Sequence, residues 1–237
     1  MKTRNLAWIL LFTALTTTVW ALLLIYTTAT SPTANTLSDQ ISIIENQGVL
    51  FILIYLNAGL LTLAFSASLS GLYLYCRDAH PLWATLALVF IPVYAACNLV
   101  AYLSQVFVVP GLLQMVHDPQ TASTAEILLR MAIHTWPGSI IEFINGLAYA
   151  VMGIPAIILG ILISRKAHGL LTGGMLLALS GLLSIVALLG IGLANPIIKF
   201  LSPLGGLLAL ASLILLALQF LRQPESDSLA AHPYQAR

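Results

Sequence analysis

The stretch WPGSIIEFINGLAYAVMGIPAIILGILIS, residues 136–164, decides the fold of this chain. It is the fourth of six long apolar runs, and Glu142 is the only carboxylate inside any of them. At about 100° per residue, this glutamate falls near one line with Gly146, Tyr149, Gly153 and Gly160. One face of the predicted helix is therefore polar at its start and then lined with glycine. Such a face favours contact with other helices over contact with lipid.

The composition of the whole chain agrees with six membrane-spanning helices. Of 237 residues, 59% are hydrophobic and only 7% are charged, whereas soluble domains carry about 25% charged residues. The long, continuous, leucine-rich runs exclude a β-barrel, and so few charges exclude a nucleic-acid-binding surface. We predict an all-α polytopic membrane protein, a six-transmembrane-helix bundle that forms a single domain over residues 1–222. The predicted helices are 6–27, 49–76, 81–109, 136–164, 170–194 and 201–221, followed by a disordered tail over 223–237.

Three segments carry further predictions. The first run is too long for a typical signal-peptide core and lacks a clean cleavage site, so we interpret it as a retained helix. Residues 28–48 read as a polar loop. In the longest connection, Ser123 and Glu126 have the spacing of a capping box, which predicts a short interfacial helix over about 123–134 with Trp136 as an anchor.

The distribution of basic residues predicts the orientation. If the N-terminus is cytoplasmic, seven Lys and Arg residues lie on the inner side and two, Arg130 and Lys199, lie on the outer side. This split follows the positive-inside rule. We therefore predict that both termini are cytoplasmic and that the protein is a multi-pass protein of the inner (plasma) membrane.

Polar residues of the second, third and fourth helices are expected to meet at one depth. Counting rise along each helix puts them in the outer half of the membrane, and consecutive antiparallel helices usually pack together. We predict an outward-opening polar pocket, below the loop that holds Arg130 and His134. Its candidate ligand-binding residues are Asn57, Tyr94, Asn98, Tyr102, Glu142, Asn145 and Tyr149.

Alternative interpretations of these residues stay open. Asn and Tyr inside a bundle often serve only as interhelical hydrogen-bonding groups, and Glu142 could pair with Arg130. A buried carboxylate in a membrane is nevertheless a functional hypothesis by default. If it looks into the bundle, we expect hydrogen bonds to it from Asn98, Tyr94 or Tyr102.

Small residues predict where helices approach closely. Gly146, Gly153 and Gly160 line one face of the fourth helix, and Gly173 lies near the start of the fifth. We predict that all four glycines are helix-packing residues.

Enzyme signatures are absent. The chain has no H-E-x-x-H, G-x-S-x-G, Walker A or C-x-x-C-H pattern, and so no catalytic residue is assigned. No metal site and no cofactor is identified by a motif, and a weak outer site at His117, Asp118 and His134 reads more simply as solvated loop.

The overall layout resembles a loose group of uncharacterised bacterial six-helix integral membrane proteins. The shared features are the basic head, a long outer loop after the first helix, short basic turns at Arg77-Asp78 and Arg165-Lys166, and a glycine-rich fifth helix. The resemblance implies a fold and transfers no activity.

Two function classes follow from the sequence. The protein binds or transports a small amphipathic molecule, such as a lipid, a quinone or a drug-like compound, in the pocket around Glu142. Alternatively, it is a structural or accessory subunit whose glycine faces dock onto another copy or another membrane protein. A membrane-embedded enzyme is the third reading. The expected partners are membrane lipids and a homo-oligomer or membrane-complex partner, with no nucleic acid.

Overall fold

The computed structural model describes residues 3–166 and 168–223, and these residues form six long apolar helices and no strand. The prediction of an all-α six-helix membrane bundle is confirmed. The spans are α1 (Thr3–Thr30), α3 (Val49–Cys76), α4 (Pro81–Phe107), α7 (Ile140–Lys166), α8 (Leu171–Gly192) and α10 (Leu201–Arg222). The predicted tail, apart from Gln223, lies outside the described residues.

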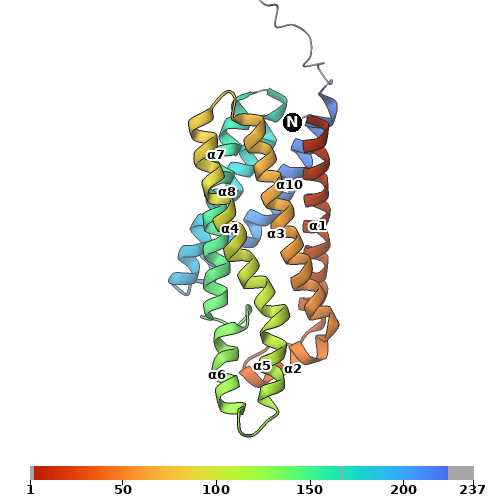
Figure 1. The fold of residues 1–237 in the computed structure, drawn as a ribbon, viewed down its shortest axis with the longest axis vertical. Coiled ribbons are helices and arrows are strands. Elements are labelled where there is room, and N and C mark those ends of the chain that lie inside the picture. Colours follow the sequence, from red (N-terminus) through yellow and green to blue (C-terminus); the bar gives the residue numbers. More distant parts are fainter. Residues whose placement is uncertain (1–2, 167, 224–237) are drawn as a thin grey trace, which may run out of the picture.

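The six spans form a closed ring of neighbours. Each long helix packs against the next one in the chain, and α10 returns to pack against α1. Helix α3 also contacts α7 across the ring. Figure 1 shows the long helices running side by side along the long axis of the molecule.

Shorter helices fill the connections. They are α2 (Leu37–Gln47), α5 (Val109–Val116), α6 (Ala122–Ala132), the 3₁₀ turn η1 (His168–Leu170) and α9 (Pro196–Lys199). Helices α2, α5 and α6 lie together at the end of the bundle away from the N-terminus (Figure 1). The reading of residues 28–48 as a loop was wrong for α2, because Thr36 and Asp39 form a capping box that starts this helix.

Two other predicted helix starts also differ from the structure. Helix α6 begins after Thr121, which makes no side-chain cap bond, so the predicted capping box at Ser123 and Glu126 does not form. Helix α7 begins at Ile140 and not at Trp136. Trp136 belongs to the turn before α7, where Gly138 has a positive φ of 77°.

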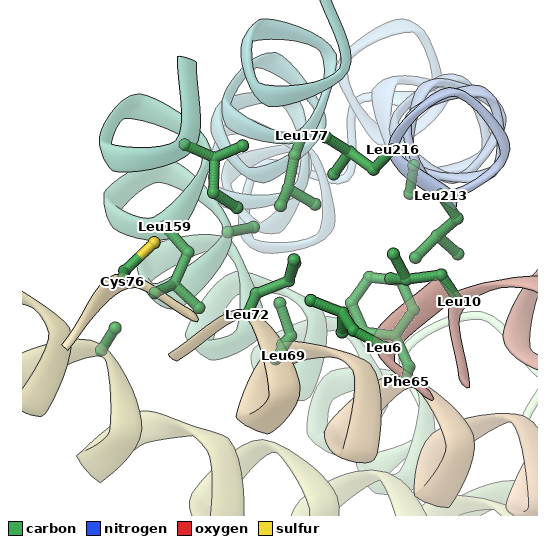
Figure 2. Close-up of a cluster of buried hydrophobic side chains, with 14 of the residues drawn as sticks. Leu6, Leu10, Phe65, Leu69, Leu72, Cys76, Leu159, Leu177, Leu213 and Leu216 are labelled. Atoms are coloured by element: carbon green, nitrogen blue, oxygen red, sulfur yellow. The ribbon is translucent and has the colours of Figure 1, made fainter. Parts of the chain in front are cut away.

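One apolar core joins all six spans. Figure 2 shows Leu6 and Leu10 of α1 beside Phe65, Leu69 and Leu72 of α3. Leu159, Leu177, Leu213 and Leu216 complete the same cluster from α7, α8 and α10. Because these side chains face inward, the exposed leucines, valines and isoleucines of the same helices remain on the outer surface for lipid.

A second apolar cluster holds the connecting helices to the bundle. Leu37, Ile41 and Ile44 of α2 are buried in it, together with Leu113 of α5 and Leu129 of α6. They pack against Phe51 and Tyr55 of α3 and Tyr102 of α4. The α4–α5 segment, Pro81–Val116, has 36 residues and spans about 54 Å, longer than a hydrocarbon layer of about 30 Å. This end of the bundle therefore extends past the apolar layer.

Helices α7 and α8 approach each other through glycine. A Cβ atom added to Gly153 would lie 2.5 Å from the carbonyl oxygen of Gly181, and one added to Gly160 would lie 2.5 Å from that of Gly174. Gly173 faces Leu216 of α10, and Gly146 faces Ile191 of α8. All four glycines proposed for helix packing therefore lie against a neighbouring helix of the same chain.

The two ends of the bundle differ in charge. At the end where α1 starts, here called the basic end, the described charged residues are Arg4, Arg77, Asp78, Arg165, Lys166 and Arg222. At the opposite, acidic end they are Asp39, Glu45, Asp118, Glu126, Arg130, Glu142 and Lys199. Basic residues thus dominate one end and acidic residues the other.

Candidate functional site

The predicted polar residues lie towards the acidic end of the bundle. Counting about 1.5 Å per residue from the basic end, Tyr94 lies about 20 Å along α4, and Asn98 and Tyr149 about 26 Å along their helices. Glu142 lies about 36 Å along α7. With a hydrocarbon layer of about 30 Å, the tyrosines and Asn98 are in the apolar layer and Glu142 is near its boundary.

Glu142 belongs to the first turn of α7, where it caps the helix. The backbone N–H of Glu142 donates to Ser139 Oγ at 2.9 Å, and the backbone N–H of Gly138 donates to Glu142 Oε2 at 2.7 Å. The arrangement is close to a capping box, with the carboxylate bonded one residue before the usual position. The Ser139-x-x-Glu142 pattern is the sequence signal for this role, and it was not among the predicted caps.

The charged partner of Glu142 is Lys199. The Lys199 ammonium donates to Glu142 Oε1, and the glutamate side chain is 11% exposed whereas that of the lysine is 50% exposed. Asn195 positions the lysine, because its Oδ1 caps α9 by accepting from the backbone N–H groups of Ile197 and Ile198 at 3.0 and 3.2 Å. An ion pair between α7 and α9 thus closes the acidic end of α7.

The expected partners of Glu142 were wrong. Its side-chain bonds come from Lys199 and Gly138, and not from Asn98, Tyr94 or Tyr102. The Arg130 guanidinium instead lies 5.3 Å from the centre of the Trp136 ring. The helix start explains this difference, since Glu142 is at the end of α7 and its carboxylate turns back towards the preceding loop.

The tyrosines and Asn98 link three helices below this ion pair. Tyr102 of α4 and Tyr149 of α7 share a hydrogen bond of 2.6 Å between their hydroxyls. The amide of Asn98 donates to Thr62 Oγ1 of α3 at 2.9 Å and to the Tyr94 hydroxyl at 3.4 Å. These bonds connect α3, α4 and α7, and they leave the buried Oδ1 of Asn98 without a hydrogen-bond partner.

Asn57 is separate from this group. In the described part of the chain, no hydrogen bond or ring contact joins Asn57 to the other six predicted residues, and its buried Oδ1 has no hydrogen-bond partner. Tyr55, two positions before it on α3, faces Tyr102 instead, with the two ring centres 6.2 Å apart. Successive helix positions differ by about 100°, so Asn57 and Tyr55 face different neighbours.

His134 is a site residue that the sequence placed only in a loop. Its imidazole packs between Tyr55 and Tyr102, at ring distances of 5.7 and 5.8 Å. Gln105 fixes this loop: its Oε1 accepts from the His134 backbone N–H at 3.0 Å, and its Nε2 donates to the Ala132 carbonyl at 2.8 Å. Gln105 is seven residues after Asn98 and so lies near the same face of α4, which was the available signal.

Burial keeps His134 neutral. It lowers the pKa of the imidazole to about 4, with a further lowering by Lys199 and opposing effects from Glu142 and Asn145. A neutral imidazole has one nitrogen that donates and one that accepts. His117, the other histidine of the weak metal site considered above, bonds to Glu45 at 2.8 Å.

Two neighbouring buried polar atoms beside the ion pair form no hydrogen bond of normal geometry. They are His134 Nε2 and Asn145 Oδ1. The Tyr55 and Tyr102 rings and the Glu142–Lys199 ion pair lie near them. We call His134, Glu142, Asn145 and Lys199, with these two tyrosines, the boundary cluster. It offers hydrogen-bonding groups next to apolar ring surface at the edge of the membrane.

The fold and its six apolar spans define a multi-pass integral membrane protein. Comparison of the chain with known protein families, curated proteins and solved structures gave no match.

Proposed function

We propose that this membrane protein binds a small amphipathic molecule, a lipid, quinone or drug-like compound, at the boundary cluster. The observation that carries the proposal is the pair of buried, unpartnered atoms His134 Nε2 and Asn145 Oδ1. Leaving a buried polar atom unpaired costs about 1–3 kcal/mol. A ligand whose polar group pairs with both atoms recovers much of that cost, which makes the cluster a favourable place for a polar head.

The surroundings of these two atoms suit an amphipathic ligand. The Tyr55 and Tyr102 rings supply apolar contact area, while the Glu142–Lys199 ion pair supplies charge close to water. Lys199 is half exposed and comes from the four-residue helix α9. Movement of this one side chain would uncover Glu142, so we assign Lys199 the role of a cover over the binding site.

We further propose that the basic end is cytoplasmic and that the protein resides in the plasma membrane. The excess of Arg and Lys at that end follows the positive-inside rule. The boundary cluster then faces the outer side, where it would meet ligands from the outer leaflet or from outside the cell.

A structural or accessory role is the second candidate. The Tyr102–Tyr149 and Asn98–Thr62 bonds favour it, because they join neighbouring helices without a ligand. The glycine faces do not support docking onto another protein, since α7 and α8 already use them for each other. In this reading the polar residues stabilise the bundle alone.

A ligand screen on matched asparagine variants tests the binding proposal. Asn145→Ala removes an unpartnered amide from the boundary cluster, whereas Asn57→Ala removes one from a separate part of α3. The purified protein and both variants are screened by thermal shift against lipids, quinones and cationic amphiphiles. We expect at least one compound to stabilise the wild type and Asn57→Ala but to lose most of its effect on Asn145→Ala.

Two results would contradict the proposal. One is a panel in which no compound stabilises the wild type. The other is equal stabilisation of the wild type and Asn145→Ala. Glu142→Gln and Lys199→Gln, assayed in the same way, separate the roles of the ion pair: if Lys199 is a cover, Lys199→Gln should raise the affinity of the active compound.

A further inference from the structure

An open apolar groove runs between α7 and α8 on the lipid-facing side of the bundle. It has a volume of about 590 Å³ and is lined by Ile157 and Ile161 of α7 and by Leu171, Met175 and Leu179 of α8, among others. Ala178 also lines it, at the point where this small side chain meets Gly160. Small residues at the helix crossing with larger side chains on both flanks leave a furrow along the surface.

The length of the groove corresponds to one leaflet. On α8 its lining residues extend from Leu171, the first residue of the helix, to Leu182. At about 1.5 Å per residue this stretch is about 16 Å long, close to half of a hydrocarbon layer of about 30 Å. The groove starts at the basic end, so it faces the acyl chains of the leaflet on that side.

An exposed arginine lies one helical turn beyond the last groove residue of α7. Arg165 follows Ile157 and Ile161 at intervals of four residues, so the three side chains share one stripe of α7. Arg165 is exposed and, among the described residues, forms no salt bridge or side-chain hydrogen bond. Its neighbour Lys166 is engaged: its ammonium donates to the Tyr75 carbonyl at 2.6 Å and lies 3.8 Å from the centre of the Tyr75 ring.

The positive charge of the basic end favours anionic lipids over neutral ones. Within the described residues the only acid at the basic end is Asp78, which pairs with Arg77 at 3.3 Å. Arg165 therefore offers a guanidinium, which binds phosphate through paired hydrogen bonds. We propose that the α7–α8 groove binds one acyl chain of an anionic phospholipid, whose headgroup phosphate lies against Arg165. The site is at the opposite end of the bundle from the boundary cluster and does not depend on the function proposed for it.

Lipid binding to matched charge variants tests the site. The full-length protein in mixed micelles is offered equimolar phosphatidylglycerol and phosphatidylcholine, and the bound lipids are counted by native mass spectrometry. A basic side chain near the membrane surface contributes about 1 kcal/mol to the binding of an anionic lipid. Arg165→Gln should therefore lower the preference for phosphatidylglycerol about fivefold. Arg222→Gln removes the same charge from the same end but away from the groove, and should keep the preference.

A third variant tests the groove itself. Met175 is 52% exposed, so Met175→Trp fills the groove without disturbing the core and should lower retention of phosphatidylglycerol. An unchanged preference in Arg165→Gln, or an equal loss in Arg222→Gln, would overturn the proposal. Unchanged retention of phosphatidylglycerol by Met175→Trp would also overturn it, including the case in which this variant loses a self-associated state. That last result would assign the groove to a second copy of the chain.

Discussion

Replacing Gly153 by alanine tests how closely α7 and α8 are packed. The added methyl carbon would lie 2.5 Å from the Gly181 carbonyl oxygen and 2.8 Å from Ile185 Cγ1. The carbonyl is backbone and cannot rotate away, so the two helices have to separate by about 1 Å to restore a normal contact of about 3.5 Å. Forcing extra atoms into a packed contact costs about 1–3 kcal/mol. We expect this cost to exceed the gain in helix propensity that alanine brings, so Gly153→Ala should destabilise the bundle.

Gly206 is the matched control for this substitution. It lies inside α10, and an added Cβ would meet no atom within 4 Å. Alanine is favoured over glycine in a helix by about 1 kcal/mol, so Gly206→Ala should stabilise the protein slightly. The gain in helix propensity applies at both positions and cancels, so the two substitutions should differ by the cost of the close contact, about 1–3 kcal/mol in the free energy of unfolding.

The assay is unfolding of the purified protein in mixed micelles by titration with SDS, followed by circular dichroism. A lower midpoint for Gly153→Ala and an unchanged or higher midpoint for Gly206→Ala are expected. If Gly153→Ala matched or exceeded the stability of the wild type, the close glycine contact between α7 and α8 would not exist in the folded protein.

Three further predictions concern the polar contacts. Gln105→Leu should destabilise the fold by about 2–4 kcal/mol in the same SDS assay, because it leaves the partly buried Ala132 carbonyl and His134 N–H unpaired. Thr13→Val should cost about 1 kcal/mol, since the hydroxyl bonds across to the Ala64 carbonyl and to Ser68 at 2.9 and 2.8 Å. The folded-state pKa of His134 is about 4, below its ordinary 6.5. The unfolded chain therefore binds more protons between these pH values, and stability should fall by up to about 3 kcal/mol as the pH drops from 6.5 to 4.

Matched variants separate these effects from general damage. His134→Phe keeps a ring between Tyr55 and Tyr102 and should lose the part of the pH dependence that lies between pH 6.5 and 4. An unaltered pH profile in that variant would show that His134 is not the titrating group. Thr18→Val removes a hydroxyl that bonds only within α1, to the Ala14 carbonyl, and should cost less than Thr13→Val. Gln105→Glu keeps the acceptor for the His134 N–H and should retain part of the stability lost in Gln105→Leu.

Much of the architecture could be predicted because it depends on local patterns. Runs of about 20 or more apolar residues form helices in a membrane, where every backbone group needs a partner within its own segment. The same local logic located Gly146, Gly153 and Gly160, since glycines spaced seven residues apart fall near one face of a helix. Local patterns did not predict the helix caps correctly. Ser123 and Glu126 have the spacing of a capping box but form no cap at the start of α6. Ser139 and Glu142 have the same spacing and do cap α7.

The candidate site was only partly predictable. Tyr94, Asn98, Tyr102 and Tyr149 come together as their shared depth suggested, because depth follows from counting residues along antiparallel helices. Asn57 forms no hydrogen bond with this group, and counting depth along a helix does not say which neighbouring helix a given face contacts.

Composition and periodicity by themselves determined that the chain crosses a membrane six times and that its polar residues gather near one end. Only the tertiary structure decided which groups meet there. The Glu142–Lys199 pair joins residues 57 positions apart, and Gln105 holds a loop 27–29 positions away. Such contacts depend on how the ring of helices closes and on where each helix begins. A shift of four residues at the start of α7 turned Glu142 from a side chain expected to look into the bundle into a helix cap at its boundary.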